Sequence, residues 1–141
     1  MLETKRCKLV ATKDLNGRVN GKLMEIASSL DGWSRFIKNS QIYLTSVLPR
    51  QKKGFHLHRK KTHQITCIKG QVILGVWDGK KITEKKLDGD KPITVRVPKN
   101  RAICFYNWGN EEAWLLNLCS PPYKPQDPEQ EDLNLSWQPR P

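Results

Sequence analysis

The three histidines of the chain lie close together, as His56, His58 and His63. A histidine side chain gains or loses a proton near neutral pH, which makes it a common general acid, general base or metal ligand. Residues i and i+2 of a β-strand project from the same face. His56 and His58 therefore point the same way if residues 54–58 form a strand, and His63 returns beside them on the next strand. This cluster predicts a site for proton transfer, or for a metal ion if all three side chains are ligands.

Basic residues flank the histidines without an intervening acid: Arg50, Lys52, Lys53, Arg59, Lys60 and Lys61. One or two of them are expected to contact a pyrophosphate, and the rest face solvent, because successive residues cannot all face one pocket. The chain has 25 Lys and Arg against 14 Asp and Glu, a net charge of +11, which attracts anions. Without a nucleic-acid recognition motif, the expected anionic partner is a nucleotide diphosphate and not a nucleic acid.

Short β-rich runs separated by turn residues position these side chains, and helical periodicity is almost absent. Gly70 joins two runs in a tight turn, and Asp78-Gly79 is a strong hairpin signal. This regular spacing predicts an antiparallel sandwich or barrel. The runs are Gly21–Ala27, Ser40–Leu48, Gly54–His58, His63–Lys69, Gln71–Trp77, Ile82–Leu87, Ile93–Pro98, Ala102–Asn107 and Glu112–Cys119.

The length of 141 residues fits one domain. No apolar run is long enough to span a membrane, and the N-terminus lacks the apolar stretch of a secretory signal, so we expect a cytoplasmic protein without a membrane partner. The cysteines match no zinc or redox spacing and are expected to be free thiols packed as small apolar residues: Cys7, Cys67, Cys104 and Cys119.

The histidine spacing resembles the first motif of the cupins. His56-x-His58, four residues, His63, six residues and Gly70 follow that motif, with His63 where a Glu is usual. The second motif is similar to Pro98-x-Asn100-x-x-Ile103-x-x-x-Asn107, in which Ile103 replaces the metal-binding His. The resemblance implies an all-β fold, a cupin jelly-roll β-barrel (double-stranded β-helix), and the loss of that ligand implies that no metal is bound.

The same resemblance suggests how the chain is organised. Residues 1–141 are expected to form a single cupin domain, with an N-terminal strand or arm over about residues 1–20. The last segment, about residues 121–141, is rich in proline and predicts an extended C-terminal arm. Leu133, Leu135 and Trp137 alternate there, so the apolar side of the arm is expected to dock on the barrel.

One branch of the cupins, the dTDP-4-dehydrorhamnose 3,5-epimerases, is similar at Lys53-Gly54-Phe55-His56 and in the closing segment Leu133-x-Leu135-x-Trp137-x-Pro139. The resemblance implies that His56 is a general base. It also implies that Asp78, eight residues after Gly70, orients this base. The catalytic Tyr of that family falls on Asn117 here, which removes its proton donor.

A second branch, the dTDP-sugar 3,4-ketoisomerases, is similar at Gly54-Phe55-His56-x-His58-x-Lys60. In that branch the paired histidines carry protons, and Tyr43 falls where those enzymes have an aromatic hydroxyl. The resemblance therefore implies that His56 and His58 transfer protons and that Tyr43 is a candidate acid.

These resemblances predict an isomerase, an epimerase or a ketoisomerase, that acts on a nucleotide-linked 4-keto-6-deoxy sugar in deoxysugar or polysaccharide biosynthesis. The ketone acidifies the neighbouring C–H, and histidine moves the proton. No cofactor is expected, and a homodimer is implied. The predicted catalytic residues are His56, His58, Asp78 and Tyr43, and the predicted substrate-binding residues are Lys53, Lys60, His63, Asn107 and Asn117.

Two alternatives stay open. A metal-dependent cupin enzyme would use His56, His58 and His63 as its ligands. A non-catalytic cupin that binds sugar nucleotides would explain the absence of the epimerase Tyr at Asn117.

Overall fold

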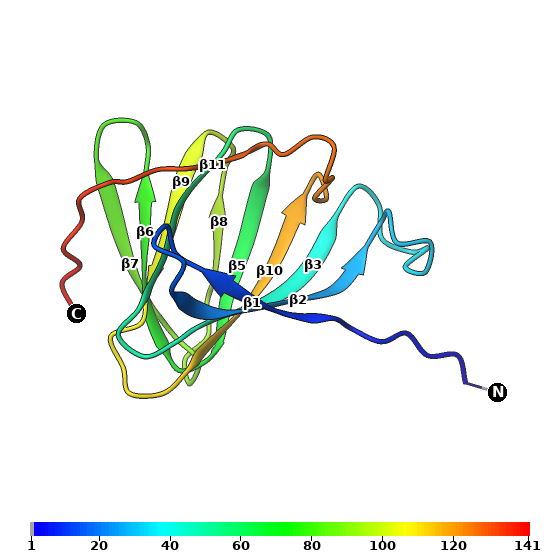
Figure 1. Ribbon diagram of the computed structural model, residues 1–141, viewed down its shortest axis with the longest axis horizontal. Helices are drawn as coiled ribbons and strands as arrows, with labels where there is room; N and C mark the ends of the chain where they lie inside the picture. The colour runs from blue at the N-terminus through cyan, green and yellow to red at the C-terminus, as the bar shows by residue number, and fades with distance from the viewer. Residues whose placement is uncertain (1) are drawn as a thin grey trace.

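The structure is a computed structural model that describes residues 2–141, and its regular elements are all β-strands (Figure 1). In chain order the strands are β1 (Leu9–Lys13), β2 (Val19–Ser28), β3 (Gln41–Val47), β4 (Lys52–His58), β5 (Thr62–Lys69), β6 (Gln71–Trp77), β7 (Ile82–Asp88), β8 (Thr94–Val97), β9 (Arg101–Tyr106), β10 (Ala113–Ser120) and β11 (Gln130–Asp132). The nine runs expected from the sequence correspond to β2 through β10, with bounds that agree within two residues, so the all-β prediction is confirmed. No helix among residues 2–141 is long and apolar enough to cross a membrane.

The strands form two antiparallel sheets that curve around a common interior (Figure 1). One sheet has the order β1-β2-β3-β10-β5-β8, and the other has the order β11-β4-β9-β6-β7. Strands distant in sequence are neighbours, such as β3 with β10 and β4 with β9. This crossing connectivity places β4, β5 and β3, which carry the histidines and Tyr43, around one interior.

Side chains alternate between the two faces of each strand, and those on the inner faces form the core between the sheets. In β10, Ala113, Leu115, Asn117 and Cys119 are buried, whereas Leu116 and Leu118 between them are exposed. Each fully buried aliphatic side chain stabilises the fold by about 1.5–3 kcal/mol. The core cluster consists of Val47, Ile65, Cys67, Val72, Leu74, Leu87, Val97, Ile103, Phe105, Ala113 and Leu115. All four cysteines are free, and Cys67, Cys104 and Cys119 are buried as expected.

A second apolar cluster lies on the outer face of the five-stranded sheet. Phe55, Ile73, Ala102 and Cys104 are buried there beneath Trp137 of the C-terminal segment. Figure 1 shows this segment running across the barrel from β11 to the C-terminus. The expected docking of the apolar C-terminal residues onto the barrel is therefore confirmed.

An irregularity in β4 determines which of its side chains face the interior. The pairing of β4 with β9 shifts register between Lys53 and His56. Gly54 lies in this bulge with φ of +120°, and a Cβ at this position would lie 2.3 Å from the carbonyl oxygen of Ile103. The extra residue lets Lys53 and His56, three positions apart, both line the interior, while Phe55 turns to the outer cluster.

Candidate active site

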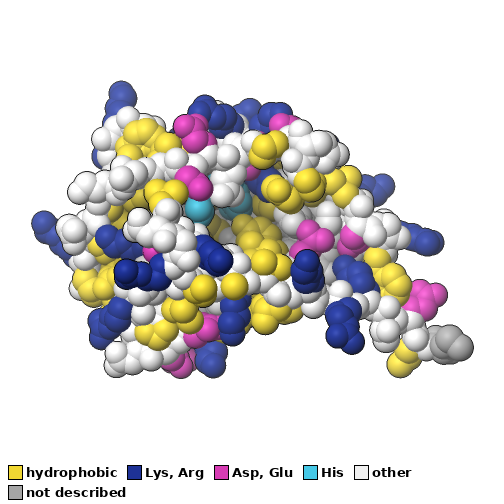
Figure 2. All heavy atoms as spheres, viewed as in Figure 1, with side chains coloured by type: hydrophobic (Ala, Val, Ile, Leu, Met, Phe, Trp, Pro, Cys, Tyr) yellow, Lys and Arg dark blue, Asp and Glu magenta, His cyan; other side chains and the backbone are white. Residues whose placement is uncertain are grey.

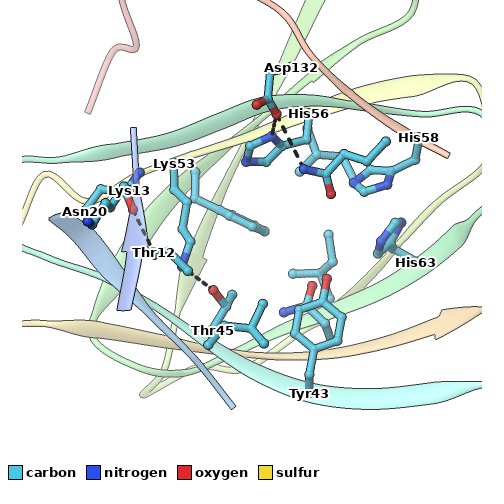
Figure 3. A pocket seen from close by; sticks show the side chains of 16 residues that line it. Thr12, Lys13, Asn20, Tyr43, Thr45, Lys53, His56, His58, His63 and Asp132 are labelled. Atoms are coloured by element: carbon cyan, nitrogen blue, oxygen red, sulfur yellow. Dashed lines mark hydrogen bonds and ion pairs between the residues drawn. The ribbon is translucent and has the colours of Figure 1, made fainter. Parts of the chain in front are cut away.

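A cavity of about 330 Å³ opens between the two sheets. Histidine side chains are visible in the hollow of the surface in Figure 2, and Figure 3 shows the cavity from close by. The lining residues are Thr12, Lys13, Asn20, Leu23, Tyr43, Thr45, Lys53, His56, His58, His63, Ile65, Ile103, Phe105, Asn117, Gln130 and Asp132. The structure thus brings together the three histidines, Tyr43, Lys53 and Asn117.

His56 is paired with a carboxylate of the C-terminal segment. Strand β11 lies antiparallel to β4, with Asp132 opposite His56. The distance between His56 Nδ1 and Asp132 Oδ1 is 2.6 Å. A carboxylate accepts hydrogen bonds, so Nδ1 carries the proton and Nε2 keeps its lone pair for a base. Both side chains of this pair are partly exposed, at 33% and 51%.

His58 is paired with a second carboxylate, and this pair is buried. His58 Nδ1 lies 2.9 Å from Glu129 Oε1, with exposed fractions of 9% and 6%. Burial lowers the pKa of His58, although the hydrogen bond that its Nδ1–H donates to Glu129 opposes that shift. Burial also raises the pKa of Glu129, but hydrogen bonds from His58 and from the backbone N–H of Lys60 bring it below its usual value. The pair is therefore a neutral imidazole beside an ionised carboxylate.

His63 lies on β5 next to His58, with 4.3 Å between the ring centroids. It is 2% exposed, and its Nδ1 has no hydrogen-bond partner. Burial lowers the pKa of His63 to about 3, with a further contribution from His58. His63 is therefore neutral near pH 7 and offers the cavity an unused polar atom.

Tyr43 projects into the cavity from β3, and Figure 3 shows it across the cavity from His56. Burial raises the pKa of Tyr43, so its hydroxyl stays protonated and can donate. Asn117 of β10 lies directly opposite Tyr43 in the strand pairing. The side-chain amide of Asn117 donates only a long bond of 3.4 Å to the carbonyl oxygen of Leu115.

Lys53 lines the cavity but is held by the protein itself. Its ammonium group donates to the carbonyl oxygens of Lys22 at 3.1 Å and Ser46 at 3.0 Å, and to the hydroxyl of Thr45. Burial lowers the pKa of Lys53 to about 7, and the charge of Glu112 opposes this shift. The residue ties β4 to β2 and β3 along one wall of the cavity.

Three of the residues expected at the site lie elsewhere. Asp78 follows β6, which β9 separates from β4, and its carboxylate accepts hydrogen bonds from the backbone N–H groups of Lys80 and Lys81. The Asp-Gly hairpin turn therefore explains the contacts of Asp78, and the carboxylate that contacts His56 is Asp132. Lys60 forms an ion pair of 2.7 Å with Asp127 on the surface.

Asn107 is fully buried and also lies outside the cavity. Its amide donates to the carbonyl oxygens of Val47 and Glu111, and its side-chain oxygen accepts the N–H of Gly109. These bonds satisfy the side chain, so its role here is to hold the loop after β9.

The sequence interpretation missed the residues that the two ends of the chain contribute to the site. The C-terminal segment supplies Glu129, Gln130 and Asp132, and the N-terminal region supplies Lys13 with its neighbours. One signal was present in the sequence: acids cluster at 127–132 of a basic chain, and the segment that follows β4 is basic. Their complementarity predicts contact between the two segments.

Among residues 2–141, no group of three or more His, Cys, Asp or Glu side chains is arranged to hold a metal ion. The Nδ1 atoms of His56 and His58 face carboxylates, and Ile103 lines the cavity between the sheets.

Solved structures with the same fold include the capsular polysaccharide assembling protein CapF from Staphylococcus aureus, at a TM-score of 0.74 and 18% identity over 91% of this chain. They also include oxalate oxidase in complex with glycolate, at a TM-score of 0.64 and 16% identity over 79% of this chain. This chain covers 35% of CapF and 54% of the oxalate oxidase chain. These neighbours identify the barrel as a cupin jelly roll.

A comparison with curated protein sequences gave no match. The family described as "FdtA: WxcM-like, C-terminal" matches residues 5–133, which is nearly the whole chain and includes both histidine–carboxylate pairs. The chain therefore belongs to the WxcM-like, C-terminal (FdtA) family.

Proposed function

We propose that the protein is an isomerase that moves protons on a nucleotide-linked 4-keto-6-deoxy sugar, with 3,4-ketoisomerisation as its reaction. One observation carries the proposal. Two histidines on one wall of the cavity each have Nδ1 held by a carboxylate, and a protonated Tyr43 lies on the facing wall. Membership of the FdtA family supports the substrate class.

The first step is removal of the proton at C3 of the sugar, which the C4 ketone acidifies. Nε2 of His56 takes this proton, because Asp132 holds the other ring nitrogen as the donor. As the C–H bond breaks, its electrons form the C3–C4 double bond and negative charge develops at O4. A hydrogen bond from Tyr43 or His63 to O4 would stabilise this charge, and a proton delivered there gives the enediol.

The second step returns a proton to the other carbon. O3 loses its proton as C4 gains one, which leaves the ketone at C3 and a hydroxyl at C4. His56, protonated at Nε2 by the first step, supplies the proton to C4. Neutral His58, two residues away on the same strand, accepts the O3 proton at its own Nε2, because Glu129 holds its Nδ1–H. Atoms and charge balance, since each proton removed is returned and no electrons leave the sugar.

The placement of both histidines on β4 favours ketoisomerisation over epimerisation. Transfer between C3 and C4 on one face of the sugar uses acid and base groups on the same wall of the cavity, and His56 and His58 both project into the cavity from β4. Epimerisation needs a donor on the opposite face. Tyr43 on the facing wall supports this second candidate, whereas Asn117 supplies no acidic proton.

The anionic nucleotide diphosphate needs a positive partner at the mouth of the cavity. Lys13 of β1 lines the cavity and is exposed, unlike Lys53, whose ammonium group is bound to backbone carbonyls. We assign the diphosphate to the Lys13 end of the cavity and the sugar to the histidine end. We also propose a cytoplasmic homodimer that acts in polysaccharide biosynthesis, a role that the name of CapF supports.

An NMR time course with dTDP-4-keto-6-deoxyglucose in heavy water tests the proposal. A new 3-keto product with deuterium at C4 is expected, and it should disappear in a His56→Asn variant that binds the nucleotide normally. Deuterium at C3 or C5 without a 3-keto product would identify an epimerase. Binding without exchange, in saturation-transfer spectra, would identify a non-catalytic binding protein. Activity that depends on a stoichiometric metal would overturn the cofactor-free mechanism.

A further inference from the structure

The C-terminal segment from Asp127 to Trp137, called the strap below, is attached to the barrel at two places. At the first, β11 pairs with β4 and brings Glu129 and Asp132 to the two histidines. This pairing is short, since β11 has only three residues. A three-residue edge strand contributes little stability by itself. The register that places the carboxylates therefore needs a second attachment.

The second attachment is the socket of Trp137, on the outer face of the five-stranded sheet. The indole packs edge-on to Phe55 with 5.4 Å between ring centroids, and it is 7% exposed. Its Nε1 donates to Glu84 Oε1 at 2.8 Å, and Lys52 Nζ donates to its carbonyl oxygen at 2.6 Å. Trp137 is thus held by apolar packing and a hydrogen bond to Glu84 at its side chain, and by a hydrogen bond from Lys52 at its backbone.

Gly75 of β6 makes room for this side chain. A Cβ built at Gly75 would lie 2.8 Å from Cη2 and Cζ2 of Trp137, a distance that real Cβ atoms essentially never show. Both atoms belong to the six-membered ring of the indole, so a phenylalanine at 137 has no atoms at these positions. The socket therefore fits a tryptophan only because residue 75 is a glycine.

The short chain between the two attachments makes the position of Asp132 and Glu129 depend on that of Trp137. Five residue steps separate Asp132 from Trp137, a reach of at most about 18 Å when extended. The N–H of Leu133 donates to the carbonyl oxygen of Phe55 at 2.9 Å, and Leu133 and Leu135 pack against the same cluster as Trp137. Displacing Trp137 would free the outer side of the strap and loosen the short pairing that seats Asp132 and Glu129.

We infer that Trp137, in its Gly75 socket, is a positioning residue for His56 and His58: it holds the strap in the register that gives both imidazoles a carboxylate at Nδ1. This inference concerns the proposed site, but its test needs neither substrate nor turnover.

The test is NMR of the imidazole groups in protein labelled with ¹⁵N-histidine. The native protein is expected to show two hydrogen-bonded Nδ1–H signals, from His56 and His58. Gly75→Ala, which unseats Trp137 without changing it, should remove or broaden both. The double variant Gly75→Ala/Trp137→Phe should recover them, because the smaller ring avoids the added methyl. If Gly75→Ala does not fold, Trp137→Ala, which empties the socket and keeps Gly75, is the second variant and should likewise remove or broaden both signals.

Val72→Ala is the matched control. Val72 is fully buried in the core between the sheets and lies at the other end of β6 from the histidines. It should lower the unfolding midpoint yet leave both Nδ1–H signals in place. A folded Gly75→Ala protein that keeps both signals would overturn the inference, as would loss of the signals in Val72→Ala.

Turnover gives a second and separate readout. If the protein is the proposed isomerase, Gly75→Ala should lower kcat by about 10²-fold with a smaller change in KM, because misplacement of the catalytic groups by about 1 Å has a cost of this size. If no variant, native included, turns over the sugar, the proposed function fails while the imidazole signals still decide the role of Trp137.

Discussion

The two histidine–carboxylate pairs of the site differ in how far they are exposed to solvent. The His56–Asp132 pair is partly exposed, whereas the His58–Glu129 pair is buried and has the buried Lys61 ammonium 4.0 Å from Glu129. An exposed pair can exchange its proton with water between turnovers, while a buried neutral imidazole keeps its proton longer. In the proposed mechanism, this asymmetry favours His56 for the step that exchanges with solvent and His58 for the step sheltered from it.

Replacing either orienting carboxylate by its amide tests this assignment. Glu129→Gln and Asp132→Asn keep the size of the side chain but can donate to Nδ1, which favours the wrong tautomer. Each is expected to lower kcat by about 10²- to 10⁴-fold, as loss of an orienting carboxylate does in hydrolases that use histidine as a base. Steady-state kinetics of the purified variants give the measurement.

The neighbouring Glu131→Gln is the control. Glu131 pairs with Arg59 on the solvent side of the strap and touches neither histidine. Its kcat should stay within about twofold of the native value, since exposed ion pairs contribute little. An equal loss in all three variants would mean that the strap is needed only for folding.

The buried histidines predict a fall in stability with acid. The folded state holds the pKa of His63 near 3, against about 6.5 in the unfolded chain, and lowers that of His58 as well. As the pH falls, the unfolded chain therefore binds protons at these histidines that the folded protein does not bind. The free energy of unfolding is highest above pH 6.5 and decreases as the pH falls below it. The maximal slope is about 1.4 kcal/mol per pH unit for each group.

Urea unfolding between pH 6.5 and 5 measures this slope before the carboxylates titrate. His63→Gln should reduce the slope, and adding His58→Gln should reduce it further. A native slope near zero in this range would contradict the burial of His63 as a neutral ring.

At the scale of elements, the sequence predicted the strands well because alternation and turn residues act locally. β6 was predicted with its observed bounds, Gln71–Trp77, and β4 was predicted with His56 and His58 on one face. The bulge at Gly54 was not predictable, because its cause is the approach of the β9 backbone at Ile103. β11 was also missed, since its pairing depends on partners about 70 residues away and not on its own proline-rich composition.

The same limit explains why three of the predicted site residues lie outside the cavity. Asp78 was assigned by resemblance, although its local Asp-Gly signal already accounted for it as a turn residue. Asn107 was placed at the site from the second cupin motif, and Lys60 from the basic segment beside the histidines. Their bonds to Val47 and Asp127 depend on tertiary neighbours that no local pattern reports.

Lys53 joins three strands, and this predicts its effect on stability. Lys53→Met should lower the free energy of unfolding by about 2–4 kcal/mol, because it removes the ammonium group that donates to the buried carbonyl oxygen of Ser46 and to the hydroxyl of Thr45. Lys86→Met on the exposed part of β7 is the control and should change it by less than about 0.5 kcal/mol. Equal urea unfolding curves for the two variants would show that the contacts of Lys53 with β2 and β3 do not stabilise the fold.

At the scale of the whole molecule, the charge distribution concerns how substrate arrives. The net charge is +11, and four acids of the strap are paired with His56, His58, Arg59 and Lys60. Basic side chains are spread over the face that carries the hollow in Figure 2. The approach to the cavity is therefore positive overall, which should raise the encounter rate of an anionic nucleotide sugar.

Ionic strength tests this steering separately from the chemistry. Raising the salt concentration from about 20 to 300 mM shortens the Debye length to well under the size of the protein, so kcat/KM should fall about 5- to 10-fold. kcat should stay constant, because the two histidine–carboxylate pairs act at short range inside the cavity. Lys13→Gln should lower kcat/KM at low salt and flatten its dependence on salt, whereas Lys86→Gln, remote from the cavity, should change neither. A kcat/KM that does not respond to salt would mean that the positive charge serves solubility and that binding depends on contacts within the cavity alone.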